Sequence, residues 1–131
     1  MDWYIEQVVA ARTWKLRKEV LSPTGKLADV MLEGDFEATH FAAYHDIDVV
    51  GVLTLIRSAN TFTIHFFAVH QAFRKRGIGT ALLRYAQHFV KTINGNCLLA
   101  HVTREQCYFW TKNGFMEVGE DNGFITFSLA L

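Results

Sequence analysis

The sequence predicts an α/β fold with a mixed antiparallel and parallel central sheet, because three segments follow the order strand, helix, strand. Residues 62–69 are rich in β-branched and aromatic side chains, which favour a strand. From residue 77 to about residue 91, apolar residues recur at helical spacing along one face. Residues 96–102 form a second apolar run, and this order makes the two strands parallel neighbours.

The first half of the chain predicts one helix and an antiparallel meander. Residues 2–8 have the composition of a strand, and residues 10–20 that of a helix. Pro23 ends that helix, because proline disfavours helical backbone in the residue before it. Residues 24–36 are polar and aperiodic, which favours a loop or a short helix. Strand-like runs joined by turns follow at residues 37–44, 49–57 and 62–69.

Short elements complete the second half. The long helix is expected to end at Asn94-Gly95, since glycine and asparagine are common just after a helix. A shorter helix is expected over residues 104–112, with the same kind of stop at Asn113-Gly114. Residues 115–118 and 124–129 then close the sheet as strands.

Length, charge and cysteine content limit the function classes. A chain of 131 residues suffices for one core, so we expect a single domain over residues 1–131. Thirteen basic residues balance thirteen acidic ones, so nucleic acid is not an expected partner. No apolar run is long enough to span a membrane. Two cysteines without metal-type spacing fit a reducing compartment, and we expect a cytoplasmic protein with no membrane partner.

A basic segment with two glycines joins the strand at residues 62–69 to the long helix. It reads Arg74-Lys75-Arg76-Gly77-Ile78-Gly79-Thr80. The first turn of a helix leaves backbone N–H groups without internal acceptors at the positive end of the dipole. We therefore expect an anion site, most naturally for phosphate. The segment lacks the Lys-Ser/Thr of a Walker loop and the third glycine of a dinucleotide fingerprint. The alternative is a glycine turn beside a solvated basic run.

Two separated motifs, in this order, resemble those of the GCN5-related N-acetyltransferases (GNAT), which move an acetyl group from acetyl-CoA to an amine. The first, Arg74-x-x-Gly77-x-Gly79, fits that family's pyrophosphate loop. The second, which looks like its aromatic block before Gly-Phe, is Phe109-Trp110-Thr111-Lys112-Asn113-Gly114-Phe115. A weaker match to short bacterial members consists of Arg17-x-x-Val20-Leu21-x-Pro23 and Gly34-Asp35.

The resemblance implies a sheet with helices on both faces, as in acyl-CoA N-acyltransferases, and acetyl-CoA as co-substrate. It implies that the strand at residues 62–69 diverges from its parallel neighbour and offers backbone groups to the pantetheine arm. The Val69 amide would lie at the thioester oxygen and stabilise the oxyanion. Amides of the basic loop would hold the pyrophosphate. The implied cofactor-binding residues are Phe67, Ala68, Val69, Arg74, Lys75, Arg76, Gly77, Ile78, Gly79 and Thr80.

The resemblance leaves the general acid unassigned. Many family members use a tyrosine four residues before the Gly of Gly-Phe, and Trp110 stands at that position here. An indole cannot supply the proton, and Tyr108 lies two residues away on another side of the helix. One proton-transfer group is worth ~10² to 10⁴ in rate. A thiol with a pKa near ~8.5 leaves tolerably as the thiolate, so we expect a loss toward the lower end.

The general base is also not the usual one. Some members use a glutamate where this chain has Thr63. His65 lies two residues along on the same face, and a neutral imidazole suits base work near pH 7, so His65 is the candidate base. His101, on the adjacent strand, is the second candidate. For both, an ordinary partly buried histidine is the alternative. The spacing of His40, His65 and His101 shows no ligand signature, so no metal is expected.

The resemblance implies an amine acceptor, either a small molecule or a protein, that no residue identifies. Glu33, Asp35 and Glu37 could receive a cationic amine, or they could form a solvated turn. The leading interpretation is an N-acetyltransferase in which the bound amine attacks the thioester directly, in a ternary complex. One alternative, suggested by Trp110 and the missing glutamate, is a module that binds CoA or acyl-CoA without turnover. Another is a protein that binds a phosphate other than CoA or is purely structural. The chain could also form a homodimer.

Overall fold

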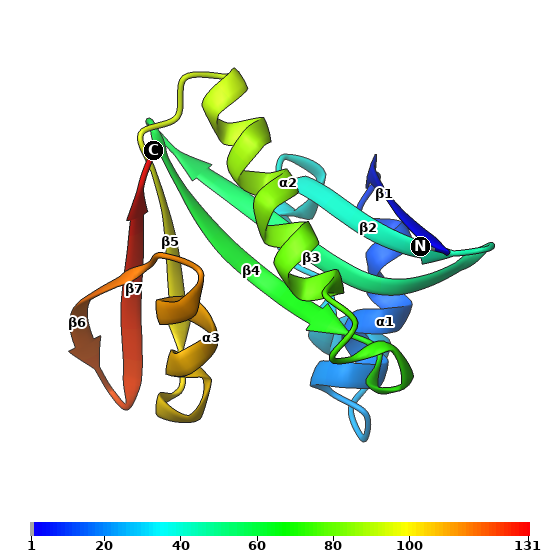
Figure 1. Cartoon of the computed structure of the whole chain (residues 1–131). Helices are drawn as coiled ribbons and strands as arrows, with labels where there is room; N and C mark the ends of the chain where they lie inside the picture. Colours follow the sequence, from blue (N-terminus) through cyan, green and yellow to red (C-terminus); the bar gives the residue numbers. More distant parts are fainter. Residues whose placement is uncertain (1) are drawn as a thin grey trace.

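One mixed sheet of seven strands organises the protein, in the order β1-β2-β3-β4-β5-β7-β6 (Figure 1). This computed structural model describes residues 2–131, and Met1 lies outside them. All neighbouring strands are antiparallel except β4 and β5, which are parallel. The strands are β1 (Trp3–Val8), β2 (Thr39–His45), β3 (Asp48–Ser58), β4 (Thr61–Val69), β5 (Cys97–Val102), β6 (Met116–Asp121) and β7 (Phe124–Ala130). The helices are α1 (Ala11–Leu21), α2 (Ile78–Thr92) and α3 (Cys107–Lys112), with short 3₁₀ helices η1 (Leu27–Val30), η2 (Glu33–Phe36), η3 (Gln71–Phe73) and η4 (Arg104–Gln106).

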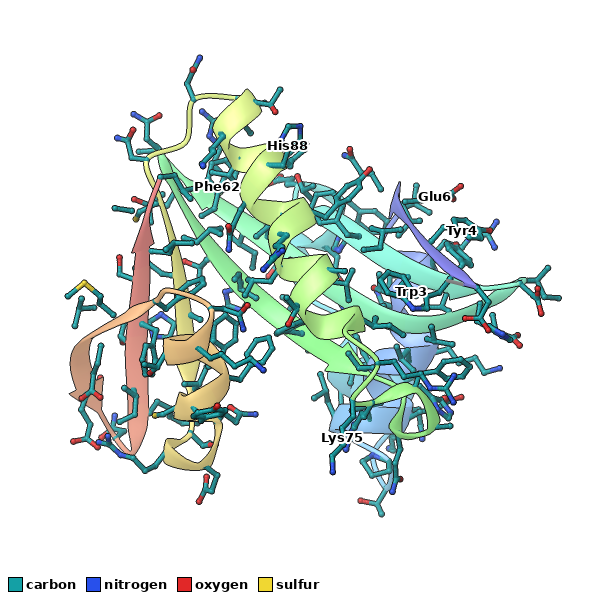
Figure 2. All side chains as sticks on the ribbon, in the orientation of Figure 1. Trp3, Tyr4, Glu6, Phe62, Lys75 and His88 are labelled. Carbon is teal, nitrogen blue, oxygen red and sulfur yellow. The ribbon has the colours of Figure 1, made fainter. Side chains whose placement is uncertain are left out.

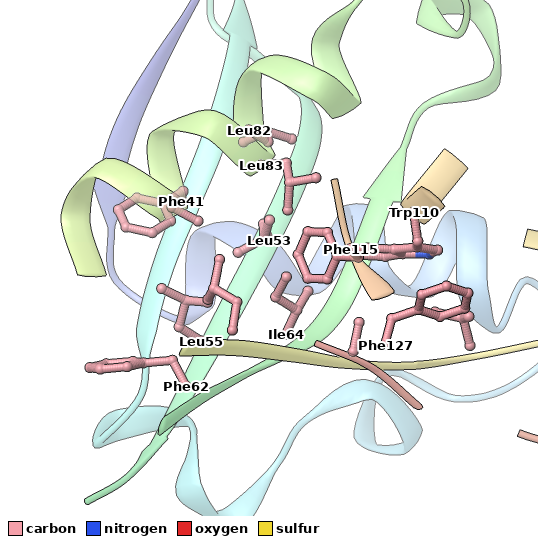
Figure 3. Packing of buried hydrophobic residues seen from close by; sticks show 14 of the residues in the cluster. Phe41, Leu53, Leu55, Phe62, Ile64, Leu82, Leu83, Trp110, Phe115 and Phe127 are labelled. Atoms are coloured by element: carbon pink, nitrogen blue, oxygen red, sulfur yellow. The ribbon is translucent and has the colours of Figure 1, made fainter. Parts of the chain in front are cut away.

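The two faces of the sheet are covered by different helices, because β2 carries apolar side chains on both faces. Phe41 belongs to the larger apolar cluster, which contains Leu82 of α2 (Figure 3). Its neighbour Ala42 belongs to a second cluster with Leu16 of α1. Successive strand residues point to opposite faces, so each cluster takes every second residue. The expected placement of helices on both faces is confirmed (Figure 1).

The apolar face of α2 holds the helix against the sheet. Its buried residues are Ile78, Leu82, Leu83, Ala86 and Val90, at the predicted spacing. The helix ends as predicted, because Asn94 takes a left-handed backbone (φ +63°) and the Gly95 amide donates to Val90 O at 2.8 Å.

The predicted strands and helices are confirmed in order and type, and the differences lie at their ends. The polar segment at residues 24–36 contains η1 and η2. The strand predicted to start at residue 37 starts at Thr39, because the Glu37 and Ala38 amides close the η2 turn on Gly34 O at 3.1 and 3.2 Å. The helix predicted over residues 104–112 is η4 followed directly by α3.

Candidate active site

β4 and β5 run side by side for only part of their length and then separate (Figure 1). A cleft lies between the separated parts of the two strands. Their pairing starts at Thr61 opposite Cys97 and ends at Ile64 opposite Ala100. Beyond that point β4 continues along β3 alone as far as Val69. The cleft has a volume of about 800 Å³ and is lined by β4, β5, the end of α1, the start of α2, η4 and α3.

A β-bulge in β4 accompanies this separation. The register between β3 and β4 shifts between Val52 and Thr54, so that Phe66 and Phe67 stand opposite the single residue Leu53. Phe66 has a left-handed backbone (φ +48°), which is uncommon for a residue with a Cβ. Such bulges bend a strand and interrupt its pairing, and they recur beside functional sites.

The backbone of Val69 points toward the cleft. The His70 amide donates to Val50 O of β3 at 2.7 Å. Successive strand residues direct their backbone groups to opposite edges, so the Val69 N–H and C=O point away from β3. The Val69 carbonyl accepts a hydrogen bond from Arg74 Nε at 3.1 Å. An N–H held in this position can donate to a developing oxyanion.

The basic loop enters α2 through two residues with left-handed backbone. Lys75 has φ +63° and Gly77 has φ +85°, and α2 begins at Ile78 directly afterwards. The Arg74, Lys75 and Arg76 side chains are exposed. Figure 2 shows Lys75 at the opposite end of α2 from His88. Three exposed cationic residues therefore directly precede the first amides of α2 along the chain, an order suited to binding an anion.

The predicted cofactor-binding residues fall into two neighbouring groups. Those on the cleft wall are Phe67, Ala68, Val69, Arg74 and Gly79. Those on the adjoining loop and first turn of α2 are Lys75, Arg76, Gly77, Ile78 and Thr80. The Ile78 side chain is 1% exposed within the core, so this residue offers only its backbone to a ligand. The binding roles of both groups stay predictions.

Of the two candidate bases, His101 lines the cleft and His65 does not. His65 is half-buried on β4. Burial lowers the pKa of His65 below 6.5, and the nearby charges of His101 and Arg17 lower it further. His101 Nδ1 lies 2.9 Å from Thr126 Oγ1. The His65 imidazole is thus neutral at pH 7, whereas His101 is the one of the two that lines the cleft, and the role of either as a base stays a prediction.

Trp110 lies inside an aromatic cluster rather than free in the cleft. It is 4% exposed, and its ring contacts Phe67, Phe109 and Phe115 with centroids 5.6, 5.3 and 5.0 Å away. Tyr108 is 77% exposed, so the two side chains point in different directions, as helical geometry predicts. Both line the cleft, which the sequence did not indicate for Tyr108.

The expectation that Asp35 receives an amine or belongs to a solvated turn is wrong. Asp35 is 1% exposed and forms an ion pair with Arg17, whose Nη1 lies 2.9 Å from Oδ2 and whose Nη2 lies 3.1 Å from Oδ1. Burial alone would raise the pKa of Asp35, but hydrogen bonds from Arg17, the Leu32 amide and Trp14 lower the pKa below 3.8. Its charge is therefore fully engaged by the protein itself.

The part of the chain that the structure describes contains neither a cluster of metal ligands nor a helix that could span a membrane. Within residues 2–131, no group of three or more His, Cys, Asp or Glu side chains could hold a metal ion. His40 is engaged internally, with Nε2 2.7 Å from Asp35 O and Nδ1 2.8 Å from Thr54 Oγ1. Over the same residues, every helix is too short or too polar to cross a membrane.

The sequence did not indicate that the end of α1 and the η4 turn belong to the cleft. Val20 and Leu21 of α1, and Glu105 and Gln106 of η4, line it. The Arg17-x-x-Val20-Leu21 pattern was the available signal for α1. Nothing comparable marked η4.

Known proteins provide a comparison for this geometry. A family model described as an acetyltransferase (GNAT) domain matches residues 37–117. No curated protein matches the sequence.

Solved structures share the whole fold at low sequence identity. PaiA N-acetyltransferase from Thermoplasma acidophilum, in complex with coenzyme A, is 17% identical, with both chains covered to 100% and a TM-score of 0.82. An IAA acetyltransferase from Bacillus cereus ATCC 14579 is 20% identical, with 98% of this chain and 99% of that chain covered and a TM-score of 0.81. A GNAT family acetyltransferase from Elizabethkingia anophelis with acetyl-CoA bound is 20% identical, with 99% of each chain covered and a TM-score of 0.79.

Proposed function

Since this chain belongs to the GNAT acetyltransferase family, we propose that it transfers the acetyl group of acetyl-CoA to a primary amine bound in the cleft between β4 and β5. Residues 1–131 act as one N-acetyltransferase domain in this proposal, which one continuous sheet from β1 to β7 supports. The two free cysteines, Cys97 and Cys107, support a cytoplasmic location.

One observation carries the proposal: the anion loop and the open edge of β4 meet at the same cleft. A Cβ at Gly79, in the first turn of α2, would lie 3.5 Å from Phe67 Cζ and 3.8 Å from Phe109 Cε1. The first turn of α2 therefore lies beside the aromatic side chains of the cleft wall, and Gly79 itself lines the cleft. A ligand with a pyrophosphate at one end and a thioester at the other suits this arrangement.

The proposed roles follow from these positions. Amides of the loop and of the first turn of α2 hold the pyrophosphate, and the open edge of β4 pairs with the pantetheine arm. The acceptor nitrogen forms a bond to the acetyl carbon while the carbon–sulfur bond breaks, and the proton lost by the amine balances the one taken up by the CoA thiolate. The Val69 amide, directed away from β3, stabilises the negative charge on the thioester oxygen.

Replacing His65 by glutamine should lower kcat/KM by about tenfold or more if His65 is the base. The base acts when neutral, and the pKa of His65 lies below 6.5. The rate of the parent enzyme should therefore fall only as the pH drops through that lowered pKa, with a plateau from neutral pH upward. The pH–rate profile of His65→Gln should lack this decrease in rate at low pH. His88→Gln, an exposed histidine on α2, serves as the control. If the decrease in rate at low pH disappears in His101→Gln and not in His65→Gln, the base is His101.

Replacing Trp110 by tyrosine should raise kcat by about a hundredfold, the lower end of the usual range for one proton-transfer group, since a phenol can protonate the departing thiolate and an indole cannot. The gain should appear in kcat rather than in the KM for acetyl-CoA, because the proton is transferred in the transition state. Steady-state kinetics measure this directly, and Phe109→Tyr, one residue away on α3, is the matched control. An unchanged or lower kcat in a folded Trp110→Tyr protein would show that the thiolate leaves unaided.

Calorimetric titration with acetyl-CoA, with dephospho-CoA for comparison, tests the proposal first. Micromolar binding is expected, whereas absence of binding at millimolar ligand would overturn it. A panel of primary amines, followed by the release of free CoA thiol, then tests turnover and separates small-molecule from peptide acceptors. Binding without release for any amine would favour the CoA-binding module that Trp110 suggests.

A further inference from the structure

Arg17 is a fully buried charge that the proposed chemistry does not use. Its side chain is 0% exposed. Besides its two hydrogen bonds to Asp35, Nη1 donates to Val30 O at 2.9 Å. Burying an arginine is costly unless its charge is paired, and a simple apolar packing would fill the same space. Arg17 therefore calls for an explanation beyond stability.

The guanidinium of Arg17 contacts both strands at the β4 bulge. Its Cζ lies 4.1 Å from the centre of the Phe66 ring. Its Nη2 donates to Thr54 Oγ1 at 2.8 Å. Thr54 pairs with His65, the last β4 residue in register before the bulge. One planar group thus touches β3 on one side of the register shift and the bulged residue of β4 on the other.

The bulge needs such a contact because its backbone is unfavourable. Phe66 adopts φ +48° although its Cβ disfavours left-handed backbone. Conformations of this kind persist where the surroundings hold them in place. A cation stacked on an aromatic face is attracted to it, and the attraction is stronger when the cation is desolvated, as the fully buried Arg17 is. Since Phe66 also lines the cleft, any relaxation of the bulge would change the cleft wall.

We propose that Arg17 is a positioning residue for acetyl-CoA: held by Asp35, it clamps Phe66 and thereby keeps β4 bulged and open toward the cleft. This proposal rests on the proposed function for its ligand. It gives the two N-terminal motif segments, one with Arg17 and one with Asp35, a shared role at a site formed by β4. Lysine cannot replace arginine here, because an ammonium lacks the plane that stacks on Phe66 while bonding to Asp35.

A double-mutant cycle between Arg17 and Phe66 tests the clamp, with the dissociation constant for acetyl-CoA as the readout. We expect Arg17→Lys and Phe66→Leu each to weaken binding by roughly fivefold to thirtyfold, the factor that corresponds to one cation–π contact with a buried cation. In the Phe66→Leu background, Arg17→Lys should raise the dissociation constant for acetyl-CoA by less than a further factor of about two, since the contact is already lost. Phe66→Tyr keeps the ring and should bind like the parent. Arg12→Lys on the same helix and the exposed Phe36→Leu are matched controls.

A merely structural role for Arg17 gives different results. Arg17→Lys would then lower the melting temperature but leave the acetyl-CoA affinity unchanged at low temperature, or change it equally in both backgrounds. If Arg17→Lys fails to fold, the comparison of Phe66→Leu with Phe66→Tyr tests the clamp without it. Equal affinities of these two variants for acetyl-CoA would overturn the clamp.

A second readout needs no ligand and separates this proposal from the proposed function. Amide hydrogen exchange at residues 65–69 reports the opening of the bulge in the free protein. Exchange there should be faster in Arg17→Lys than in Arg12→Lys. If the parent protein does not bind acetyl-CoA, the proposed function fails while the exchange rates still test the clamp. Equal exchange in the two variants would overturn it.

Discussion

Replacing Arg74 and Gly77 together by glutamate should weaken acetyl-CoA binding by at least about a hundredfold, the loss expected for two or more charge-assisted hydrogen bonds. The substitution removes the cation that donates to Val69 O and places carboxylates beside the first amides of α2. Both changes repel a pyrophosphate. Isothermal calorimetry measures the affinity, and circular dichroism verifies that the variant folds.

The control must carry the same chemical changes away from the loop. Gly123 is an exposed glycine with φ +84°, and a Cβ added there would meet no atom within 4 Å, so it matches Gly77 in backbone and surroundings. Combined with the exposed Arg12, it gives Arg12→Glu with Gly123→Glu, which changes net charge and strain equally. This control should bind like the parent. Equal affinities of test and control variants would remove the anion site from residues 74–80.

Replacing Asp35 by alanine should lower the free energy of unfolding by about 3–5 kcal/mol, because it leaves the buried Arg17 charge without its counter-ion. This is a large share of the ~5–15 kcal/mol by which domains are usually stable. Urea denaturation measures the loss. Glu33→Ala, an exposed carboxylate two residues away, should change stability by less than about 0.5 kcal/mol.

A double variant distinguishes charge burial from packing. Arg17→Met with Asp35→Leu removes both charges, so it should be markedly more stable than Asp35→Ala. If the double variant is as unstable as Asp35→Ala, the ion pair itself is what stabilises this region. The clamp predicts in addition that this double variant, though folded, binds acetyl-CoA weakly, since the stacked cation is gone.

The ion pair also determines how the stability of the fold changes at acidic pH. The pKa of Asp35 is lower in the folded protein than its ordinary value of 3.8. The contribution of ionised Asp35 to the free energy of unfolding is therefore fully present at pH values above 3.8. It is lost as the pH falls through the pKa that Asp35 has in the folded protein, which is lower.

The local elements could be predicted because their causes are local. Apolar spacing in α2 and the stop at Asn94-Gly95 are properties of adjacent residues, and the structure confirms both. The basic loop was recognisable for the same reason, since Gly77 meets a need for left-handed backbone within a few residues. The function of Asp35 could not be predicted this way, because its partner Arg17 is 18 residues away on another element.

The order of strands and helices, the parallel pairing of β4 with β5 and the place of the basic loop could all be inferred from the sequence. Which side chains of β4 face the larger core cluster depends instead on tertiary contacts, because the bulge reverses the alternation along the strand. Ile64 faces the larger core cluster, and a regular strand would turn Phe66 and Ala68 to the same side. With one extra residue at the bulge, Phe67 and Val69 face that cluster instead. A register shift depends on contacts between strands and on Arg17 beneath them, and no pattern within residues 62–69 contains that information.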